Sequence, residues 1–240
     1  MSPRDEWEKQ AENWIRFATT PGHDVTFWRF GLPRFLALLP EPGRLTIDIG
    51  CGEGRLPRLL RERGYSVVGV DASPSLVERA AEVGPKRYIV ADAARLPIRD
   101  ACADLVIAYM SLTDVEGMGA AVADIGRVLV PGGRFCFAIL HPINTAGAYA
   151  QRTGDAPFVI EGSYLDARRV VYHTDRGGIP MTFHGMHRPL SAYTDALSRA
   201  GLLIETLQEP PIDDTSVDED WSEIRWRRLP LCLFVSAVKP

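Results

Sequence analysis

Short apolar strands alternate with amphipathic helices between residues 45 and 140. Strands are predicted over 45–50, 65–71, 86–92, 102–110 and 134–140, and helices over 56–64, 73–84 and 115–130. This alternation is typical of parallel βαβ units. Helices then cover both faces of the sheet, which explains why the strands are almost uninterrupted apolar runs. We therefore expect an α/β fold with a doubly wound, mostly parallel sheet.

The flanking segments are predicted from helical periodicity and turn residues. They are helices over 5–18, 26–39 and 189–202, strands over 203–210 and 229–238, and a Gly-, Pro- and Tyr-rich stretch over 142–190 that contains a hairpin around 175–178. An insertion at the carboxyl end of a strand lies where such sheets bind ligands. We predict one domain over 1–240, with an N-terminal helical cap (1–42), a ligand-binding core (43–141), a lid or substrate insertion after the fifth strand (142–188) and a final helix with strands (189–240).

The composition excludes several classes of partner. The chain has 27 Lys plus Arg against 31 Asp plus Glu, a net charge of −4, so we expect no nucleic-acid binding through bulk charge. No apolar run approaches the ~18 residues of a membrane-spanning helix, and the first residues lack the apolar core of a secretory signal. The four cysteines are widely spaced, without a CxxC motif. We expect a cytoplasmic protein without membrane or metal partners, in which the acidic run over 213–223 is a solvated loop.

A glycine-rich loop follows the first strand and precedes a helix. Its sequence is Asp48-Ile49-Gly50-Cys51-Gly52-Glu53-Gly54. Glycines there let the backbone approach a ligand closely and adopt positive φ. Dinucleotide-binding proteins place G-x-G-x-x-G at this point, but here the third glycine comes one residue early and Arg55 takes its expected place. The acidic residue before the loop suits an ammonium group and would repel a pyrophosphate.

Two further acids end strands of the predicted sheet. Asp71 ends the second strand, where a carboxylate can accept both hydroxyl protons of a ribose. Asp92 ends the third strand, where Asp92 and Ala93 can take an exocyclic amine and offer a backbone N–H. Three acids around a glycine turn describe a ligand with ammonium, ribose and adenine parts.

At this point the chain resembles the class I S-adenosylmethionine-dependent methyltransferases. The motifs that carry the resemblance, over about residues 45–140, are DIGCGEG, VVGVDASPSLVERA, ADAARLPI, ADLVIAYMSLTDV and RVLVPGGRF. The resemblance implies a seven-stranded Rossmann-like sheet, closed by a hairpin with one antiparallel strand. It also implies a methyltransferase with S-adenosylmethionine as cofactor.

The resemblance further implies roles for single residues. The glycines Gly50, Gly52 and Gly54 would line the methionine part, Asp71 would hold the ribose, Asp92, Ala93 and Leu96 would contact the adenine, and the backbone near Tyr109 would meet the methionine amino group. Asp48 and Ala72 would also belong to the cofactor site. Cys51 occupies the variable loop position, where a small filler without a redox role is the alternative. Trp14 and His23 are candidates to cover the cofactor, with ordinary core packing as the alternative for Trp14.

The methyl acceptor is predicted to be a small molecule with an O or N nucleophile. The segment Tyr109-Met110-Ser111-Leu112 lacks the Asn/Asp-Pro-Pro-Tyr pattern of amino-methylating nucleic-acid enzymes, and no Pro-Cys pair of the cytosine-C5 type is present. We expect a monomer or homodimer. His141 follows the fifth strand directly, so we predict it as a general base. Its alternative role is a hydrogen bond to the backbone at the root of the lid. Tyr149, Phe158 and Tyr164 form either an aromatic acceptor wall or a small lid core.

Three alternatives to methyl transfer stay open. They are a rearrangement or cyclisation on the same fold, a non-catalytic S-adenosylmethionine-binding subunit, and an NAD-binding oxidoreductase, which the position of the third glycine disfavours.

Overall fold

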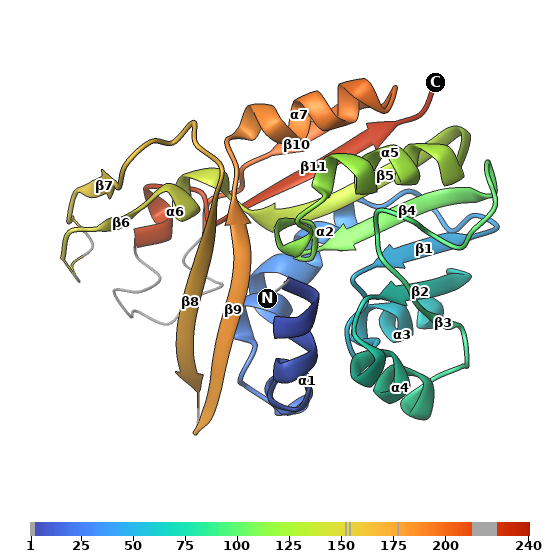
Figure 1. The fold of residues 1–240 in the computed structure, drawn as a ribbon, viewed down its shortest axis with the longest axis horizontal. Helices are drawn as coiled ribbons and strands as arrows, with labels where there is room; N and C mark the ends of the chain where they lie inside the picture. The colour runs from blue at the N-terminus through green and yellow to red at the C-terminus, as the bar shows by residue number, and fades with distance from the viewer. Residues whose placement is uncertain (1–2, 152, 154, 177, 213–224) are drawn as a thin grey trace.

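A seven-stranded sheet runs through the protein (Figure 1). The computed structural model describes residues 3–151, 153, 155–176, 178–212 and 225–240. The strands of the sheet are β1 (Thr46–Ile49), β2 (Val67–Asp71), β3 (Tyr88–Val90), β4 (Ala103–Tyr109), β5 (Leu129–Leu140), β10 (Leu203–Gln208) and β11 (Cys232–Val238). Their order is β10-β11-β5-β4-β1-β2-β3. β11 is antiparallel to β5 and β10, whereas the other neighbouring pairs are parallel. The predicted fold class is confirmed.

The direction of winding reverses between β1 and β4. β1 pairs with β2 on one side and with β4 on the other. The helix after β1, α3 (Arg55–Glu62), packs on one face of the sheet, and the helix after β4, α5 (Met118–Val128), packs on the opposite face. Because the chain leaves the two strands toward opposite faces, a crevice opens at their carboxyl ends.

Each face of the sheet has its own apolar core. On one face α2 (Leu32–Leu38) and α3 surround the fully buried side chains Phe35 and Leu60. On the other face α5 and α7 (Leu190–Arg199) contribute Val122, Ile125 and Leu197. Among the described residues, no helix has both the length and the apolar character that crossing a membrane requires.

The helix predicted over 26–39 is divided in two. A π-helical turn covers Thr26–Gly31, and α2 begins after it. Pro33 in the first turn of α2 has no amide N–H, and in a continuous α-helix its ring would press on the carbonyl four residues earlier. The wider π turn relieves that clash. The acidic run over 213–223, predicted as a solvated loop, lies outside the described residues.

Residues 142–188 form two small sheets on a short helix. The elements are α6 (Pro142–Ala146), β6 (Gly147–Tyr149), β7 (Phe158–Ile160), β8 (Arg168–Arg176) and β9 (Ile179–His187). The predicted hairpin is present, because β8 and β9 pair across the turn after Arg176. Figure 1 shows this hairpin beside α1 (Pro3–Thr19). Trp7 and Trp14 of α1 make edge contacts with Phe183 of β9, so the two segments share an aromatic core.

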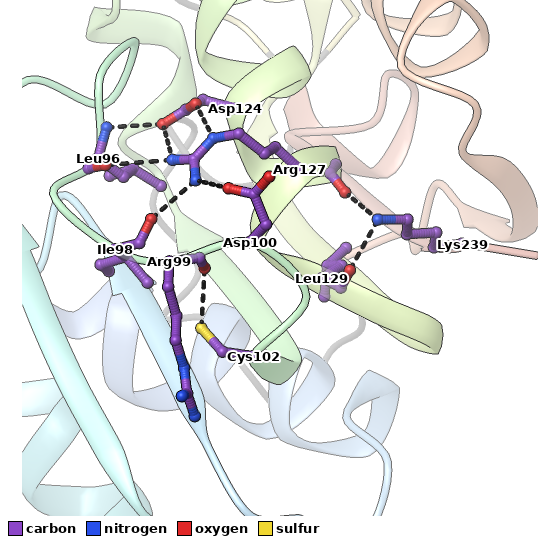
Figure 2. A network of polar contacts seen from close by, with 10 residues as sticks. Leu96, Ile98, Arg99, Asp100, Cys102, Asp124, Arg127, Leu129 and Lys239 are labelled. Carbon is purple, nitrogen blue, oxygen red and sulfur yellow. Dashed lines mark hydrogen bonds and ion pairs between the residues drawn. The ribbon is translucent and has the colours of Figure 1, made fainter.

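A polar network fixes the loop between β3 and β4 (Figure 2). The Arg127 guanidinium of α5 donates to the carbonyl oxygens of Leu96 and Ile98 at 3.1 and 2.7 Å. The Asp124 carboxylate accepts the Leu96 N–H at 2.6 Å and also binds Arg127. The loop that carries the predicted adenine contacts is therefore anchored to α5.

Stability is expected to depend on the centre of the sheet far more than on its edge. Ile107 in β4 is fully buried, so Ile107→Ala should lower the free energy of unfolding by about 2–5 kcal/mol through lost burial and a cavity. Leu203 in the edge strand β10 is 60% exposed, and Leu203→Ala should change the free energy of unfolding by about 0.5 kcal/mol or less. Urea unfolding of both variants measures the contrast. Equal losses would contradict this account of the core.

Candidate active site

The glycine loop is clamped between β2 and the end of β4. Its three glycines have positive φ, +72° at Gly50, +55° at Gly52 and +84° at Gly54. A Cβ on Gly50 would lie 2.2 Å from Cβ of Ser111. The Ser111 hydroxyl in turn donates to the Ile49 carbonyl at 2.5 Å. Glycine is therefore required where the loop meets the segment after β4.

Asp71 holds the loop from the neighbouring strand. One carboxylate oxygen accepts the Gly52 N–H at 2.8 Å, and the other accepts the Ser73 N–H at 2.9 Å. Burial nevertheless raises the pKa of Asp71 above its ordinary value, against the opposing effect of these hydrogen bonds. Each carboxylate oxygen can accept more than one hydrogen bond, so Asp71 keeps acceptor capacity for a ligand.

Asp48 lies beneath the loop and is 1% exposed. Burial, and secondarily the charge of Asp71, raise the pKa of Asp48 to about 8. Its Oδ2 atom is buried without a hydrogen-bond partner among the described residues. A buried carboxyl in this state is neutral at pH 7 unless a cation approaches it.

A cavity of about 740 Å³ opens at the carboxyl ends of β1, β2 and β4. Most of the predicted cofactor residues lie on its wall, namely Trp14, Gly50, Gly52, Asp71, Ala72, Asp92, Ala93 and Tyr109. The remaining predicted site residues do not line it, namely His23, Asp48, Cys51, Gly54, Leu96, His141, Tyr149, Phe158 and Tyr164. Cys51 is buried, and burial raises the pKa of its thiol well above the ordinary value.

The wall facing the glycine loop comes from α1 and the hairpin. The indole Nε1 of Trp14 lies 3.1 Å from the position that a Cβ on Gly52 would take. Glu8 fastens α1 to the start of α4 (Pro74–Val83), because its carboxylate accepts hydrogen bonds from the hydroxyls of Ser73 and Ser75. Phe183, His184 and other β9 residues complete this side of the cavity.

The structure gives His141 a capping position. Its Nδ1 accepts the Ile143 N–H at 3.1 Å at the start of α6, and its Nε2 lies 2.6 Å from a Glu209 carboxylate oxygen. Nε2 therefore carries the proton that is shared with Glu209. Burial lowers the pKa of His141, against the opposing effect of Glu209. Both ring nitrogens therefore have partners. The bond from the Ile143 N–H corresponds to the backbone-binding role that the sequence analysis gave as the alternative to a general base.

The sequence analysis missed two residues that line the cavity after β4. Met110 has a φ of +56°, which is uncommon outside glycine and is often found at functional sites. Asp114 ends the short 3₁₀ helix Leu112–Asp114. The signal that indicated Asp71 and Asp92, an acid near the carboxyl end of a strand, extends to Asp114, which lies in the segment that follows β4.

Known methyltransferases share this core. A family model described as a methyltransferase domain matches residues 47–137, from β1 to near the end of β5. Among solved structures, an S-adenosylmethionine-dependent methyltransferase from Mesorhizobium loti is similar with a TM-score of 0.70 and 30% identity, over 86% of this chain and 96% of that one.

Curated relatives match over a shorter stretch. Malonyl-[acyl-carrier protein] O-methyltransferase of Serratia marcescens is 31% identical over 123 residues, which are 51% of this chain and 46% of that protein. The ubiquinone/menaquinone biosynthesis C-methyltransferase UbiE of Caulobacter vibrioides is 34% identical over 121 residues, 44% of this chain and 48% of that protein. The chain thus spans about half the length of these relatives.

The buried carboxyl of Asp48 should make stability fall as pH rises. With the native pKa raised to about 8 from 3.8, the native state binds a proton that the unfolded state has lost between these values. Stability is therefore fully present below the unfolded pKa and is lost as pH rises toward about 8. Asp48→Asn removes the titration, so its melting temperature should fall less between about pH 5 and pH 9. Parallel melting curves for both proteins would contradict the raised pKa.

Proposed function

We propose, from the premise that the chain belongs to the S-adenosylmethionine-dependent methyltransferases, that it methylates an O or N nucleophile of an apolar small molecule. The observation that carries this proposal is the shared cavity. One wall holds the glycine loop with Asp71 and Asp92, and the other holds aromatic and aliphatic side chains. A cofactor and an acceptor can therefore meet in one enclosed space.

The residues around the glycine loop fit the cofactor. Gly50 and Gly52 would hold the methionine part, Asp71 the ribose hydroxyls, and Asp92 with Ala93 the adenine. Asp48, whose Oδ2 has no hydrogen-bond partner among the described residues, lies beneath the loop and outside the cavity wall, where a nearby positive charge would favour its ionised form. When bound, S-adenosylmethionine supplies a methyl group already activated on a sulfonium.

The acceptor side supports an apolar substrate. Its wall includes Phe27, Phe30, Met110, Leu140, Trp226 and Leu231. Arg55 also lies there, but its guanidinium stacks on Phe27 at 3.7 Å from the ring centroid and pairs with Asp24 at 2.7 Å. The charge of Arg55 is thus already compensated. These surfaces would align the acceptor and exclude water, which are the main contributions a protein makes to such a transfer.

The insertion is proposed to act as the lid. Val170, Tyr172 and Thr174 of β8 and residues 183–186 of β9 contribute to the cavity wall, and α1 lies against β9. The family match ends at residue 137, before the insertion begins. One relative is named for a malonyl-acyl carrier protein and the other for ubiquinone/menaquinone biosynthesis, but each matches only about half of this chain. The acceptor is therefore inferred from the cavity.

The decisive experiment is a transfer assay. The protein is incubated with methyl-labelled S-adenosylmethionine and a cell extract freed of protein and nucleic acid. Label in a small organic product supports the proposal. Tight cofactor binding without labelled product would favour the rearrangement or the non-catalytic alternative. In a parallel reaction to which the protein and nucleic acid of the extract are added back, label only in those macromolecules would overturn the small-molecule acceptor.

Loss of Asp71 should weaken cofactor binding. Asp71→Ala removes charge-assisted hydrogen bonds to the ribose, on the order of 1.5–3 kcal/mol, so affinity for S-adenosylhomocysteine should drop about tenfold to a hundredfold. Asp104 is a matched control, since its carboxylate also accepts two backbone N–H groups, at 2.6 and 2.9 Å, but at the amino end of β4. Calorimetry should find that Asp104→Ala binds normally. Unchanged affinity in folded Asp71→Ala would refute the ribose assignment.

His141 should matter for stability rather than for proton transfer. Asparagine is a good N-cap, so His141→Asn should preserve the bond to the Ile143 N–H and keep methyl transfer within about threefold of wild type. His141→Ala should lose the cap and about 1 kcal/mol of stability. A fall of roughly 10²–10⁴-fold in the rate with folded His141→Asn would instead restore the general-base role predicted from the sequence.

A further inference from the structure

Asp114 occupies the junction between the two walls of the cavity. It lies three residues after Ser111, which packs on Gly50 of the glycine loop. Thr113 and Asp114 both line the cavity, as do Gly185 and Met186 of β9 on the facing segment. Asp114 therefore lies where the cofactor side meets the acceptor side.

Hydrogen bonds and close packing fix the position of the Asp114 carboxylate. The Thr113 hydroxyl donates to Oδ1 at 3.1 Å, and the Trp7 side chain of α1 donates a further hydrogen bond. A Cβ on Gly185 would lie 3.3 Å from the same oxygen, so glycine lets the hairpin close onto the carboxylate. Elements from three parts of the chain converge on this group.

No cation pairs directly with Asp114 among the described residues, although the nearby charge of Arg188 opposes the rise in the pKa of its carboxyl. Within the part of the chain that the structure describes, no ion pair within 4.0 Å includes it. The charged groups on the surrounding elements are Arg4 and Glu6 of α1, Asp71 after β2, His184 of β9, Arg188 after β9 and Glu116 in its own loop. Arg188 donates hydrogen bonds to the carbonyl oxygens of Val115 and Glu116 at 2.6 and 3.0 Å, so its guanidinium group is hydrogen-bonded to the backbone. Burial is the main cause that raises the pKa of Asp114 to about 7.

We infer that Asp114 is the carboxylate that faces the reacting centre and takes the proton of the acceptor. This inference rests on the proposed function and narrows its substrate class to neutral or cationic molecules with an O–H or N–H group. As the acceptor's lone pair bonds to the methyl carbon, the carbon–sulfur pair stays on sulfur as S-adenosylhomocysteine, and the proton passes to Asp114. An acceptor that reacts as a carboxylate needs no base and is repelled by Asp114.

The first test needs no acceptor. Sinefungin carries an amine on the carbon that replaces sulfur, so its ammonium lies where the transferable methyl would be, whereas S-adenosylhomocysteine has no charge there. Near pH 8 the Asp114→Asn variant should bind sinefungin roughly tenfold more weakly, as expected for loss of a charged hydrogen bond. Its affinity for S-adenosylhomocysteine should change less than about threefold.

The pH dependence makes this test specific. In wild type the preference for sinefungin should decline as pH falls from about 8 to 6, because the Asp114 carboxylate becomes protonated. In Asp114→Asn that decline should be absent. Glu116→Gln is the matched control, since it removes a neighbouring carboxylate that is half exposed and paired with Arg169. An unchanged sinefungin preference in Asp114→Asn, or the same loss in Glu116→Gln, would overturn the inference.

The second test uses the labelled-extract assay. Asp114→Asn should lower label transfer by roughly 10²–10⁴-fold, the range for a positioned base, whereas Glu116→Gln stays near wild type. Near-normal transfer by Asp114→Asn, or label found only as methyl esters of carboxylic acids, would overturn the inference while leaving the proposed function intact. If wild type transfers no label at all, the proposed function fails, and the sinefungin measurements still decide whether Asp114 faces that position.

Discussion

The close approach of Gly50 to Ser111 is the contact on which the site depends. It joins the loop after β1 to the segment after β4, at the point where the winding of the sheet reverses. No side chain fits there, since a Cβ on Gly50 would overlap Ser111. Once these two segments are locked together, the loop N–H of Gly52 reaches Asp71 on the next strand. This one junction thus positions the glycine loop, Asp71 and the turn that carries Asp114.

Three carboxyl groups with raised pKa values surround this junction. Asp48 lies beneath the loop, Asp71 beside it and Asp114 across from it, and burial is the leading cause of the shift in each case. Such a cluster opposes folding whenever the groups ionise. The same cluster suits a ligand that brings positive charge, because a sulfonium and an ammonium would compensate the carboxylates.

The sequence was most informative where local patterns determine structure. The strands and helices between 45 and 140, the Ser73-Pro74 start of α4 and the turn of the β8–β9 hairpin follow from periodicity, capping and turn residues. Strand-end acids were predicted for the same reason. Periodicity did not indicate the π turn before Pro33, because that turn follows from a steric clash of the proline ring within one helix. The contact of His141 Nε2 is made with Glu209, which is 68 residues away in the chain and which no local pattern connects to it.

Asp114 illustrates a different reason why sequence reasoning is incomplete. An acid after a strand is visible in the sequence, but its burial is created by Trp7 from the N-terminal helix and Gly185 from the insertion. Neither segment belongs to the part that matches the methyltransferase family model. The family-matched core carries the glycine loop, Asp71, Asp92 and Asp114, while α1 and the hairpin set the environment of the Asp114 carboxylate. Of the side chains proposed to face the acceptor, Met110 lies within that core, whereas Phe27, Phe30, Leu140, Trp226 and Leu231 lie outside it. On the proposed function, acceptor choice can therefore differ between relatives that share the core.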